Sequence, residues 1–422
     1  MALISEDREI LRKRSTGRVN ILKDDVEADA AMRGNIGIAH TRWATHGKPT
    51  EKNAHPHLCN ETVGLVHNGI IENHEALRVA QESLGYRFTS NTDTEVIVHQ
   101  VHQNLEHSDG LFNALQLTVK ELEGAYSIAV ISNLDPDTLV VARQGSPLVI
   151  GVGEDENFIA SDVSALIAKT RQFIFLEDGD VARITTDDID IVDKSGSPVE
   201  RKIHLSSISA DAVDLGEYRH YMLKEIFEQA VAVSDTLEGR LSGNRFLSAT
   251  FGHGADKIFE RIDNVQIIAC GTSYHAGLIA RYWLEGLAGI SASVEVASEF
   301  RYRSHVVPDN CLVITISQSG ETADTLAALK YARSIGFKHS LCICNVAESS
   351  LVRESELMLL THAGPEIGVA STKAFTAQLV ALMQVVIALG RKNSMTQELE
   401  EKIDSELRGL QAKITEVLEL DE

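Results

Sequence analysis

The 422-residue sequence is short of positive charge, of cysteine and of long apolar runs, and each shortage excludes a class of protein. Lys plus Arg number 39 against 61 Asp plus Glu, so the net charge of −22 disfavours nucleic acid and anionic membranes as partners. The five cysteines show no paired spacing, which argues against a disulfide-stabilised secreted scaffold and favours a cytoplasmic location. Residues 375–389 fall short of the roughly 20 apolar residues of a membrane span. They predict a buried or interfacial helix.

The pattern of predicted strands and helices changes near residue 205. Up to that point short apolar strands alternate with turns, as in 64–67, 127–131 and 138–142, which predicts antiparallel sheets in an α+β domain. After residue 260, short apolar runs are separated by helix-length segments, which predicts a doubly wound parallel sheet. The predicted strands of this second part are 265–269, 294–297, 312–316, 341–344 and 357–360. Residues 395–422 predict a charged amphipathic helix.

Two hydroxyl-rich turns in the second part indicate a phosphate site. Cys270-Gly271-Thr272-Ser273 and the segment 317–322, Ser-Gln-Ser-Gly-Glu-Thr, each follow a predicted strand and open a predicted helix. Backbone N–H groups and hydroxyls converge at such a position, where the helix N-terminus favours negative charge. Two consecutive turns of this kind make a sugar-phosphate site the leading interpretation.

A second group of residues, in the first part, suits the binding of an amino acid amide. Arg42 suits a carboxylate, Asp93 suits an α-ammonium group, and Asn68 with the Gly69 N–H suits the oxyanion of a tetrahedral intermediate. Each residue also has a structural alternative. Asn68-Gly69 is a common hairpin turn, Arg42 suits a structural ion pair, and Asp93 suits a helix cap. The histidines, among them His55 and His57, lack metal-ligand spacing, so no metal is expected.

The order of these motifs resembles the class II glutamine amidotransferase domain, an N-terminal-nucleophile fold of stacked antiparallel sheets. The resemblance rests on segments 40–47, 53–57, 67–75 and 92–95. It implies that glutamine or its oxyanion is bound by Arg42, Thr45, His46, Asn68, Gly69 and Asp93, and that Trp43 gates the path of ammonia.

The nucleophile of that family is a cysteine at the mature amino terminus in a Cys-Gly-Ile context, and its own α-amine acts as the base. This sequence shows no such residue, and its first cysteine is Cys59. Residues 1–5 resemble the interior of a strand rather than a leader. We therefore expect the strand with the nucleophile to be missing and the chain, as written, not to hydrolyse glutamine.

The second part resembles a sugar isomerase (SIS) domain, on segments 270–274, 299–302, 317–325 and 366–375. With the connector 218–228, the whole chain resembles the glucosamine-6-phosphate synthase family. The resemblance implies that Ser317, Gln318, Ser319 and Thr322 hold the phosphate, that Thr272 and Ser273 contact the sugar, and that Val369 and Ser371 line the pocket. Three structural alternatives stay open: Thr322 as only an N-cap, Cys270 as a buried core thiol and Lys373 as a surface lysine.

The resemblance implies an amidotransferase domain over 1–208, a linker over 209–225, a first SIS domain over 226–394 and the start of a missing second SIS domain over 395–422. The expected family function is transfer of the glutamine amide nitrogen to fructose 6-phosphate, giving glucosamine 6-phosphate and glutamate. A homodimer through the SIS domain is expected, without metal, organic cofactor, nucleic acid or membrane. The alternative is a non-catalytic sugar-phosphate-binding or regulatory SIS module.

Overall fold

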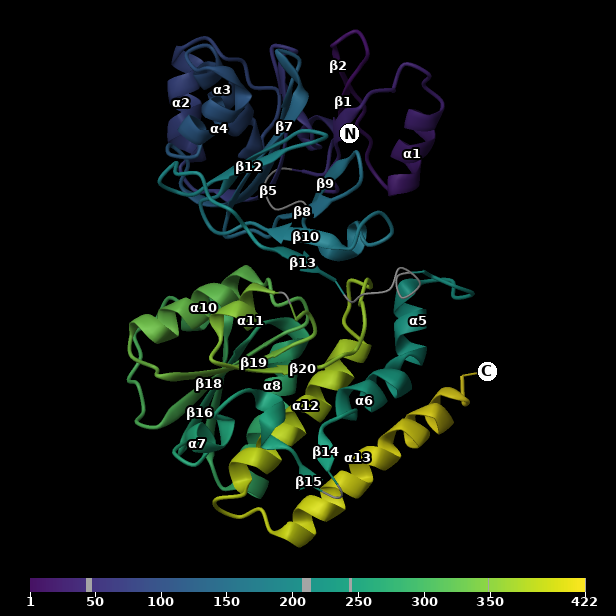
Figure 1. The fold of residues 1–422 in the computed structure, drawn as a ribbon, viewed down its shortest axis with the longest axis vertical. Coiled ribbons are helices and arrows are strands. Elements are labelled where there is room, and N and C mark those ends of the chain that lie inside the picture. Colours follow the sequence, from purple (N-terminus) through teal and green to yellow (C-terminus); the bar gives the residue numbers. More distant parts are fainter. Residues whose placement is uncertain (43–47, 207–213, 243–244, 348, 422) are drawn as a thin grey trace. The chain divides into compact units, whose positions relative to one another are not determined.

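The computed structural model describes residues 1–42, 48–206, 214–242, 245–347 and 349–421, and the chain divides into two compact units, Met1–Ile208 and Ser209–Glu422 (Figure 1). Each unit has its own sheets and its own core. The first unit is strand-rich and antiparallel, and the second alternates strands with helices. Both match the fold classes expected from the sequence.

The first unit contains thirteen named strands and four α-helices within the described residues. The strands are β1 (Ala2–Ile4), β2 (Ile10–Arg12), β3 (Ile36–Ile38), β4 (His57–Cys59), β5 (Val63–Ile71), β6 (Gly124–Ser132), β7 (Asp135–Gln144), β8 (Val149–Val152), β9 (Asn157–Ala160), β10 (Gln172–Phe175), β11 (Val181–Ile184), β12 (Ile189–Val192) and β13 (Ile203–Leu205). The helices are α1 (Val19–Glu27), α2 (His74–Ser83), α3 (Thr94–Leu105) and α4 (Gly110–Thr118).

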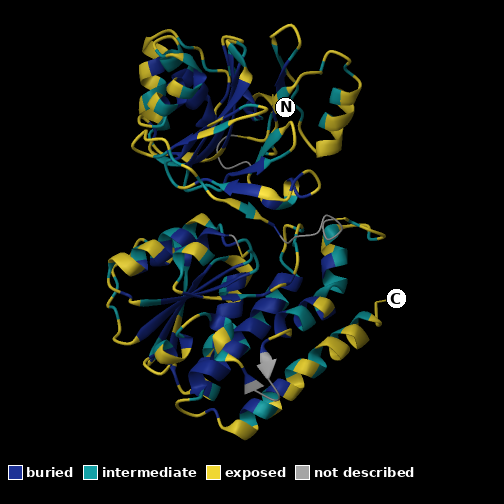
Figure 2. Cartoon of the chain, in the orientation of Figure 1, coloured by how far each residue is buried: buried dark blue, intermediate teal, exposed yellow. Residues whose placement is uncertain are grey.

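A six-stranded antiparallel sheet, in the order β12-β11-β7-β6-β5-β4, carries two cores on its two faces. Because successive side chains of a strand point to opposite faces, Val130 joins the core under α3 and α4 while Ile131 joins the core on the other face. That second core also takes Ile150 of the four-stranded sheet β13-β10-β8-β9 and Ile4 of the three-stranded sheet β2-β1-β3. The strand expected at residues 1–5 is present as β1, and its residues are buried (Figure 2).

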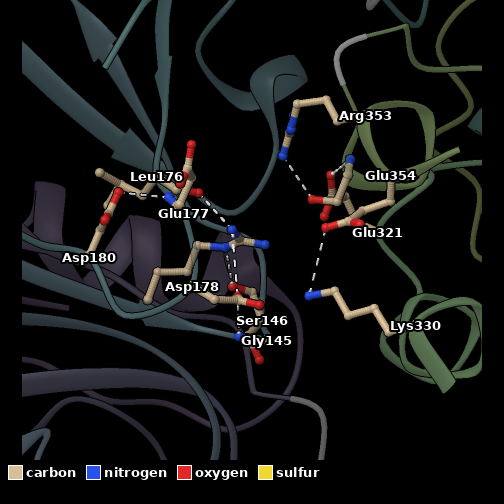
Figure 3. A network of polar contacts seen from close by, with 12 residues as sticks. Gly145, Ser146, Leu176, Glu177, Asp178, Asp180, Glu321, Lys330, Arg353 and Glu354 are labelled. Carbon is tan, nitrogen blue, oxygen red and sulfur yellow. Dashed lines mark hydrogen bonds and ion pairs between the residues drawn. The ribbon is translucent and has the colours of Figure 1, made fainter. Parts of the chain in front are cut away.

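Arg143 ties the loops at one end of these sheets together. Its guanidinium donates to the carbonyl oxygens of Leu176 at 2.6 Å and Ser146 at 3.1 Å, and the Gly145 N–H donates to the Asp178 carboxylate at 2.8 Å (Figure 3). Arg143 is 6% exposed, so these hydrogen bonds replace the water that the buried guanidinium has lost.

The second unit contains nine α-helices and seven strands within the described residues. The helices are α5 (Tyr221–Phe227), α6 (Gln229–Leu237), α7 (Ala255–Phe259), α8 (Gly271–Trp283), α9 (Ala297–Phe300), α10 (Ala323–Ser334), α11 (Ser350–Glu354), α12 (Lys373–Gly390) and α13 (Gln397–Leu418). The strands are β14 (Leu241–Ser242), β15 (Arg245–Phe246), β16 (Asn264–Ala269), β17 (Ser291–Val296), β18 (Cys311–Ser317), β19 (His339–Cys344) and β20 (Leu357–Leu360).

The main sheet of the second unit is fully parallel, in the order β17-β16-β18-β19-β20. Both faces are covered, because Ile267 lies in the core with α8 and α12 while its neighbour Ile268 lies in the core with α9 and α10. The strand expected at 294–297 begins and ends earlier, at Ser291–Val296, and Ala297 already starts α9. The apolar run predicts the end of this strand one residue too late, at Ala297 instead of Val296.

The two carboxyl-terminal helices differ in burial (Figure 2). Helix α12 is long and apolar enough to cross a membrane, but 78% of it is buried inside the second unit, so it serves as a core helix. Helix α13 is amphipathic and mostly exposed, as the sequence predicts. Its start is held by the Thr396 side chain, which accepts from the Leu399 N–H at 3.2 Å, and by the ion pair of Arg391 with Glu400.

Candidate functional site

Strand β5 presents the proposed oxyanion residues where it leaves the core. Residues Val63–His67 are buried, whereas Asn68 and Gly69 are exposed, and both pair with β6. Gly69 has a φ of 132°, and a Cβ there would lie 2.0 Å from the Ala125 carbonyl oxygen. Only glycine fits this close approach. The hairpin-turn alternative for Asn68-Gly69 is wrong, because the dipeptide lies within a strand.

His40 orients the Asn68 side chain. Its Nε2 lies 2.6 Å from Asn68 Oδ1. Burial lowers the pKa of His40, so the ring is neutral at pH 7 and has one N–H to donate. Donation from Nε2 to the amide oxygen leaves the Asn68 NH₂ group for a ligand, as an oxyanion donor requires. The motif that contains His40 does not indicate this role from the sequence.

Arg42 and Asn68 line one cavity of about 890 Å³ in the first unit, with His40 and the basic residues Arg14 and Arg18. Arg42 also donates to the Lys48 carbonyl oxygen at 3.5 Å. The remaining predicted residues of this segment, Trp43, Thr45 and His46, lie outside the described residues. A guanidinium and an amide donor therefore line the same cavity, whereas Gly69 and Asp93 are not among its lining residues.

Asp93 is fixed against the same strand as Asn68 and Gly69. It is 6% exposed, and its Oδ2 accepts from the Ile71 N–H at 2.9 Å. It occupies the N-cap position of α3 but makes no side-chain cap bond, so the capping alternative is wrong. The Asp93 carboxylate therefore contacts β5 at Ile71, two residues beyond Gly69, and a carboxylate there suits the recognition of an ammonium group.

A cluster of buried histidines, which the spacing of these residues does not predict, lies beside this cavity. His55 stacks on His40 with ring centroids 4.2 Å apart, and accepts from the His67 N–H at 3.3 Å. His67 Nδ1 contacts the Thr94 hydroxyl at 3.1 Å, and His57 Nε2 contacts the Thr92 hydroxyl at 3.1 Å. No group of three potential metal ligands occurs in the part of the chain that the structure describes.

Burial keeps two of these histidines neutral. It lowers the pKa of His57 to about 3 and that of His67 to about 4, from the usual value of 6.5. Between pH 6.5 and the lower pKa values of the folded state, these histidines bind protons in the unfolded chain but not in the folded chain. The folded state is therefore fully stable above pH 6.5 and loses stability as the pH falls toward the folded pKa values. We expect each histidine to remove up to about 1.4 kcal/mol of stability per pH unit in that window.

Urea unfolding of the first unit within the full chain, at pH 7, 6 and 5, measures this effect. His57→Asn removes one titrating group and is expected to flatten the pH dependence, whereas the same change at the exposed His107 is expected to leave it unaltered. An equally steep loss in the His57 variant would contradict the assignment.

Cys59 does not provide a nucleophile for this cavity. It is 1% exposed, its Sγ lies 3.1 Å from His99 Nδ1, and burial raises its pKa to about 12. The thiolate is the reactive form of cysteine, so this thiol is inert at neutral pH.

The second unit gathers its predicted residues at one edge of the parallel sheet. Strands β16 and β18 pair in register, with Ala269 opposite Ile316, so the turns that follow them emerge side by side. From β16 the chain continues to β17 on one side of that strand and then crosses to β18 on its other side. The boundary between β16 and β18 is therefore the topological switch point of the sheet. Ligands of open parallel sheets bind at such a point.

The 317–322 turn is internally bonded. Ser317 Oγ accepts from the Gly320 N–H at 3.0 Å and contacts Thr322 Oγ1 at 3.1 Å, and Ser319 Oγ accepts from the Glu321 N–H at 3.2 Å. Thr322 occupies the N-cap position of α10 but makes no side-chain cap bond, so the N-cap alternative is wrong. The turn holds three hydroxyls at the start of a 12-residue helix, a suitable environment for phosphate.

The turn after β16 supplies the other hydroxyls. Gly271 begins α8, and Thr272 and Ser273 occupy its first turn. Cys270 precedes them and is only partly buried against the core on the α10 face of the sheet. Cys270 therefore packs against the core as expected, but its thiol is only partly buried rather than fully buried.

Val369 and Ser371 lie in the irregular segment 361–372, the loop that follows β20 at the same sheet edge. Val369 is 85% exposed, and Ser371 donates to Glu366 at 2.9 Å. The interpretation of Lys373 as a surface lysine is wrong. It is 3% exposed, and its Nζ pairs with Glu228 at 2.6 Å, because α6 packs against the start of α12.

Comparison with known proteins agrees with this division. Residues 40–168 match the model of the glutamine amidotransferase domain, and residues 258–388 match the model of the SIS domain. The fold and these matches define a glutamine amidotransferase joined to a sugar isomerase domain.

Full-length relatives identify the family. The chain is 54% identical over 415 residues to glutamine–fructose-6-phosphate aminotransferase (isomerizing) of Shewanella oneidensis, covering 98% of this chain and 68% of that protein. It is 55% identical over 422 residues to the enzyme of the same name in Pseudomonas syringae pv. tomato, covering 100% and 69%. The chain belongs to the family of isomerizing glutamine–fructose-6-phosphate aminotransferases.

Among solved structures, part of the chain is similar to the C-terminal domain of glucosamine-fructose-6-phosphate aminotransferase from Francisella tularensis. The identity is 49%, the match covers 49% of this chain and 58% of that one, and the TM-score is 0.48.

Proposed function

We propose that the first unit binds glutamine and the second binds fructose 6-phosphate, for transfer of the amide nitrogen that gives glucosamine 6-phosphate and glutamate. The observation that carries this proposal is the joining of two sites in one chain of this family. One is a cavity with Arg42 and Asn68, and the other is a hydroxyl-rich sheet edge at the switch point of a parallel sheet.

In the first unit, Arg42 pairs with the carboxylate of glutamine and Asp93 with its ammonium group. Thr45 and His46 complete the pocket, and Trp43 gates the path of ammonia. When the side-chain amide is attacked, negative charge develops on its oxygen. The Asn68 NH₂ group, oriented by His40, and the Gly69 N–H stabilise that charge. These donors act on the tetrahedral intermediate and need no rearrangement, because β5 and His40 already fix them.

In the second unit, Ser317, Gln318, Ser319 and Thr322 hold the phosphate at the start of α10. Thr272 and Ser273 contact the sugar from the neighbouring strand end, and Val369 and Ser371 close the pocket from the 361–372 loop. A homodimer through this unit and a cytoplasmic location without nucleic-acid or membrane partners belong to the same proposal.

Glutamine hydrolysis needs a nucleophile that these residues do not provide. Cys59 is buried with a raised pKa, and the other four cysteines lie in the second unit. We expect a polypeptide of these 422 residues to bind glutamine and fructose 6-phosphate in calorimetric titrations without releasing ammonia from glutamine. Cys59→Ser is the control and is expected to change neither binding nor the ammonia baseline.

Steady ammonia release would contradict this account of the nucleophile, and failure to bind fructose 6-phosphate would contradict the proposed sugar site. The lack of a nucleophile among these cysteines favours a second candidate function for the polypeptide, a non-catalytic sugar-phosphate-binding or regulatory module. Binding of fructose 6-phosphate without any glutamine affinity would support that alternative.

A further inference from the structure

The 361–372 loop is an irregular segment held almost entirely by side chains. Within the described residues, no backbone N–H of residues 362–371 donates to a backbone carbonyl. Irregular backbone of this kind must satisfy its polar groups in another way. Three side chains do so, and they come from different elements: Asn345 after β19, Glu366 within the loop and Glu225 in α5.

Asn345 and Glu366 fix the two ends of the loop. Asn345 Oδ1 accepts from the Ala363 N–H at 2.7 Å, and its Nδ2 donates to the Gly364 carbonyl oxygen at 2.7 Å. At the other end, Glu366 accepts from the Thr372 N–H at 2.8 Å and the Ala374 N–H at 3.1 Å, which caps α12.

Glu225 holds the middle of the loop, immediately before Val369. Its Oε1 accepts from the N–H groups of Ile367 at 2.6 Å and Gly368 at 2.8 Å. The side chain is only 2% exposed, and its Oε2 is buried without a hydrogen-bond partner among the described residues. Burying a carboxylate is costly unless hydrogen bonds compensate its lost hydration, and the two backbone N–H groups of the loop provide these bonds.

The packing around Gly368 confirms how closely Glu225 and the loop fit. A Cβ at residue 368 would lie 2.5 Å from Glu225 Oε2 and 3.5 Å from the Met222 Cα, so both contacts are to α5. Two further contacts join the start of α12, directly after the loop, to the junction between α5 and α6. Lys373 pairs with Glu228 at 2.6 Å, and the Thr376 hydroxyl donates to Gln229 at 2.7 Å.

We infer that Glu225 is a positioning residue for the sugar site, and that it holds the 361–372 loop in the conformation that presents Val369 and Ser371. The inference rests on the proposed function, which assigns those two residues to the sugar pocket. Glu225 is assigned no substrate contact and acts through the loop. It lies 142 positions from Ile367 in the chain and comes from the helix that follows the connecting segment.

The inference separates two ligands. The hydrogen bonds described for the phosphate turn 317–322 lie within the turn or reach α10 and residues 344–351, whereas Glu225 bonds to Ile367 and Gly368. We therefore expect loss of the Glu225 side chain to leave inorganic phosphate binding intact. Fructose 6-phosphate also needs the loop. We expect Glu225→Ala to weaken fructose 6-phosphate binding about tenfold, the effect of losing charge-assisted hydrogen bonds, and to leave phosphate affinity unchanged.

The test is calorimetric titration of fructose 6-phosphate and of inorganic phosphate into the full 422-residue chain and its variants. Glu225→Gln retains an acceptor oxygen and is expected to recover most of the fructose 6-phosphate affinity. Gly368→Ala leaves Glu225 in the sequence but displaces its carboxylate, and is expected to reproduce the selective loss. Asp404→Ala is the matched control, because Asp404 is also 2% exposed but pairs with Arg408 at 3.0 Å in α13.

Equal fructose 6-phosphate affinity in Glu225→Ala and the parent would overturn the inference. Proportional weakening of both ligands would also overturn it, since that is the effect of general destabilisation, which the Asp404 control reproduces. If Glu225→Ala does not fold, Gly368→Ala decides by the same two titrations. A parent chain that binds phosphate but not fructose 6-phosphate would overturn the proposed sugar site and this inference together. A parent that binds both and a variant that also binds both would overturn only the inference.

Discussion

Replacing Gly320 with alanine is expected to abolish measurable binding of fructose 6-phosphate. Gly320 has a φ of 66°, and a Cβ there would lie 2.1 Å from Ser349 Oγ and 2.7 Å from Cys344 Sγ. Both neighbours are buried, so neither can move aside. The turn must therefore shift, and the bond from the Gly320 N–H to Ser317 Oγ is lost with it. We expect an affinity loss of at least about 100-fold and a destabilisation of about 2–3 kcal/mol.

Calorimetric titration and urea unfolding of the variant measure both effects. The matched control is Gly409→Ala, since Gly409 lies within α13 and a Cβ there meets nothing within 4 Å. This control is expected to gain about 0.5–1 kcal/mol of stability, because alanine is the better helix former, and to bind fructose 6-phosphate like the parent. A Gly320 variant with parental affinity would show that the turn does not form the phosphate site.

Replacing Asp93 with asparagine is expected to remove glutamine binding while leaving the fold nearly unchanged. Asp93 accepts from the Ile71 N–H at 2.9 Å, and asparagine keeps an oxygen that can accept the same bond. We therefore expect the free energy of unfolding to change by less than about 1 kcal/mol. Asparagine loses the negative charge that would pair with the ammonium group of glutamine. Loss of one partner of a buried charge pair costs about 2–4 kcal/mol, or roughly 30- to 1000-fold in affinity.

Titration of glutamine into the full chain, with urea unfolding in parallel, tests this prediction. Asp193→Asn is the control, because Asp193 is a turn carboxylate after β12 that accepts from Ser195 and Ser197 and belongs to neither proposed site. It is expected to retain parental glutamine affinity. Unchanged affinity in the Asp93 variant would remove Asp93 from the glutamine site, and a large loss of stability would make its role structural.

Several site elements could be predicted from the sequence because their determinants are local. The hydroxyl-rich turns after β16 and β18 follow from apolar runs that end in Ser, Thr and Gly, and parallel register then places them at one edge. The exposed end of β5 was less predictable, because Asn68-Gly69 suits a hairpin as well as a strand. Pairing with β6 decided in favour of the strand.

Contacts between distant residues could not be predicted. Lys373 has a surface-like sequence context and becomes a buried ion-pair partner only because α6, 145 positions away, brings Glu228 to it. His40 and Asn68 are 28 positions apart, and nothing in their separate motifs indicates that one orients the other. The three side chains that hold the 361–372 loop are likewise brought together only by the fold.

The sequence by itself determined the two fold classes, the parallel and antiparallel sheets and the types of residue available at each site. It did so because apolar periodicity and turn chemistry act over a few neighbouring residues. Only the tertiary structure decided that Asn68 is oriented by His40, that Cys59 is inert, that Lys373 is buried and that Glu225 holds the 361–372 loop. The physical reason is that hydrogen bonds, burial and shifted pKa values depend on neighbours in space, which the chain supplies from distant positions.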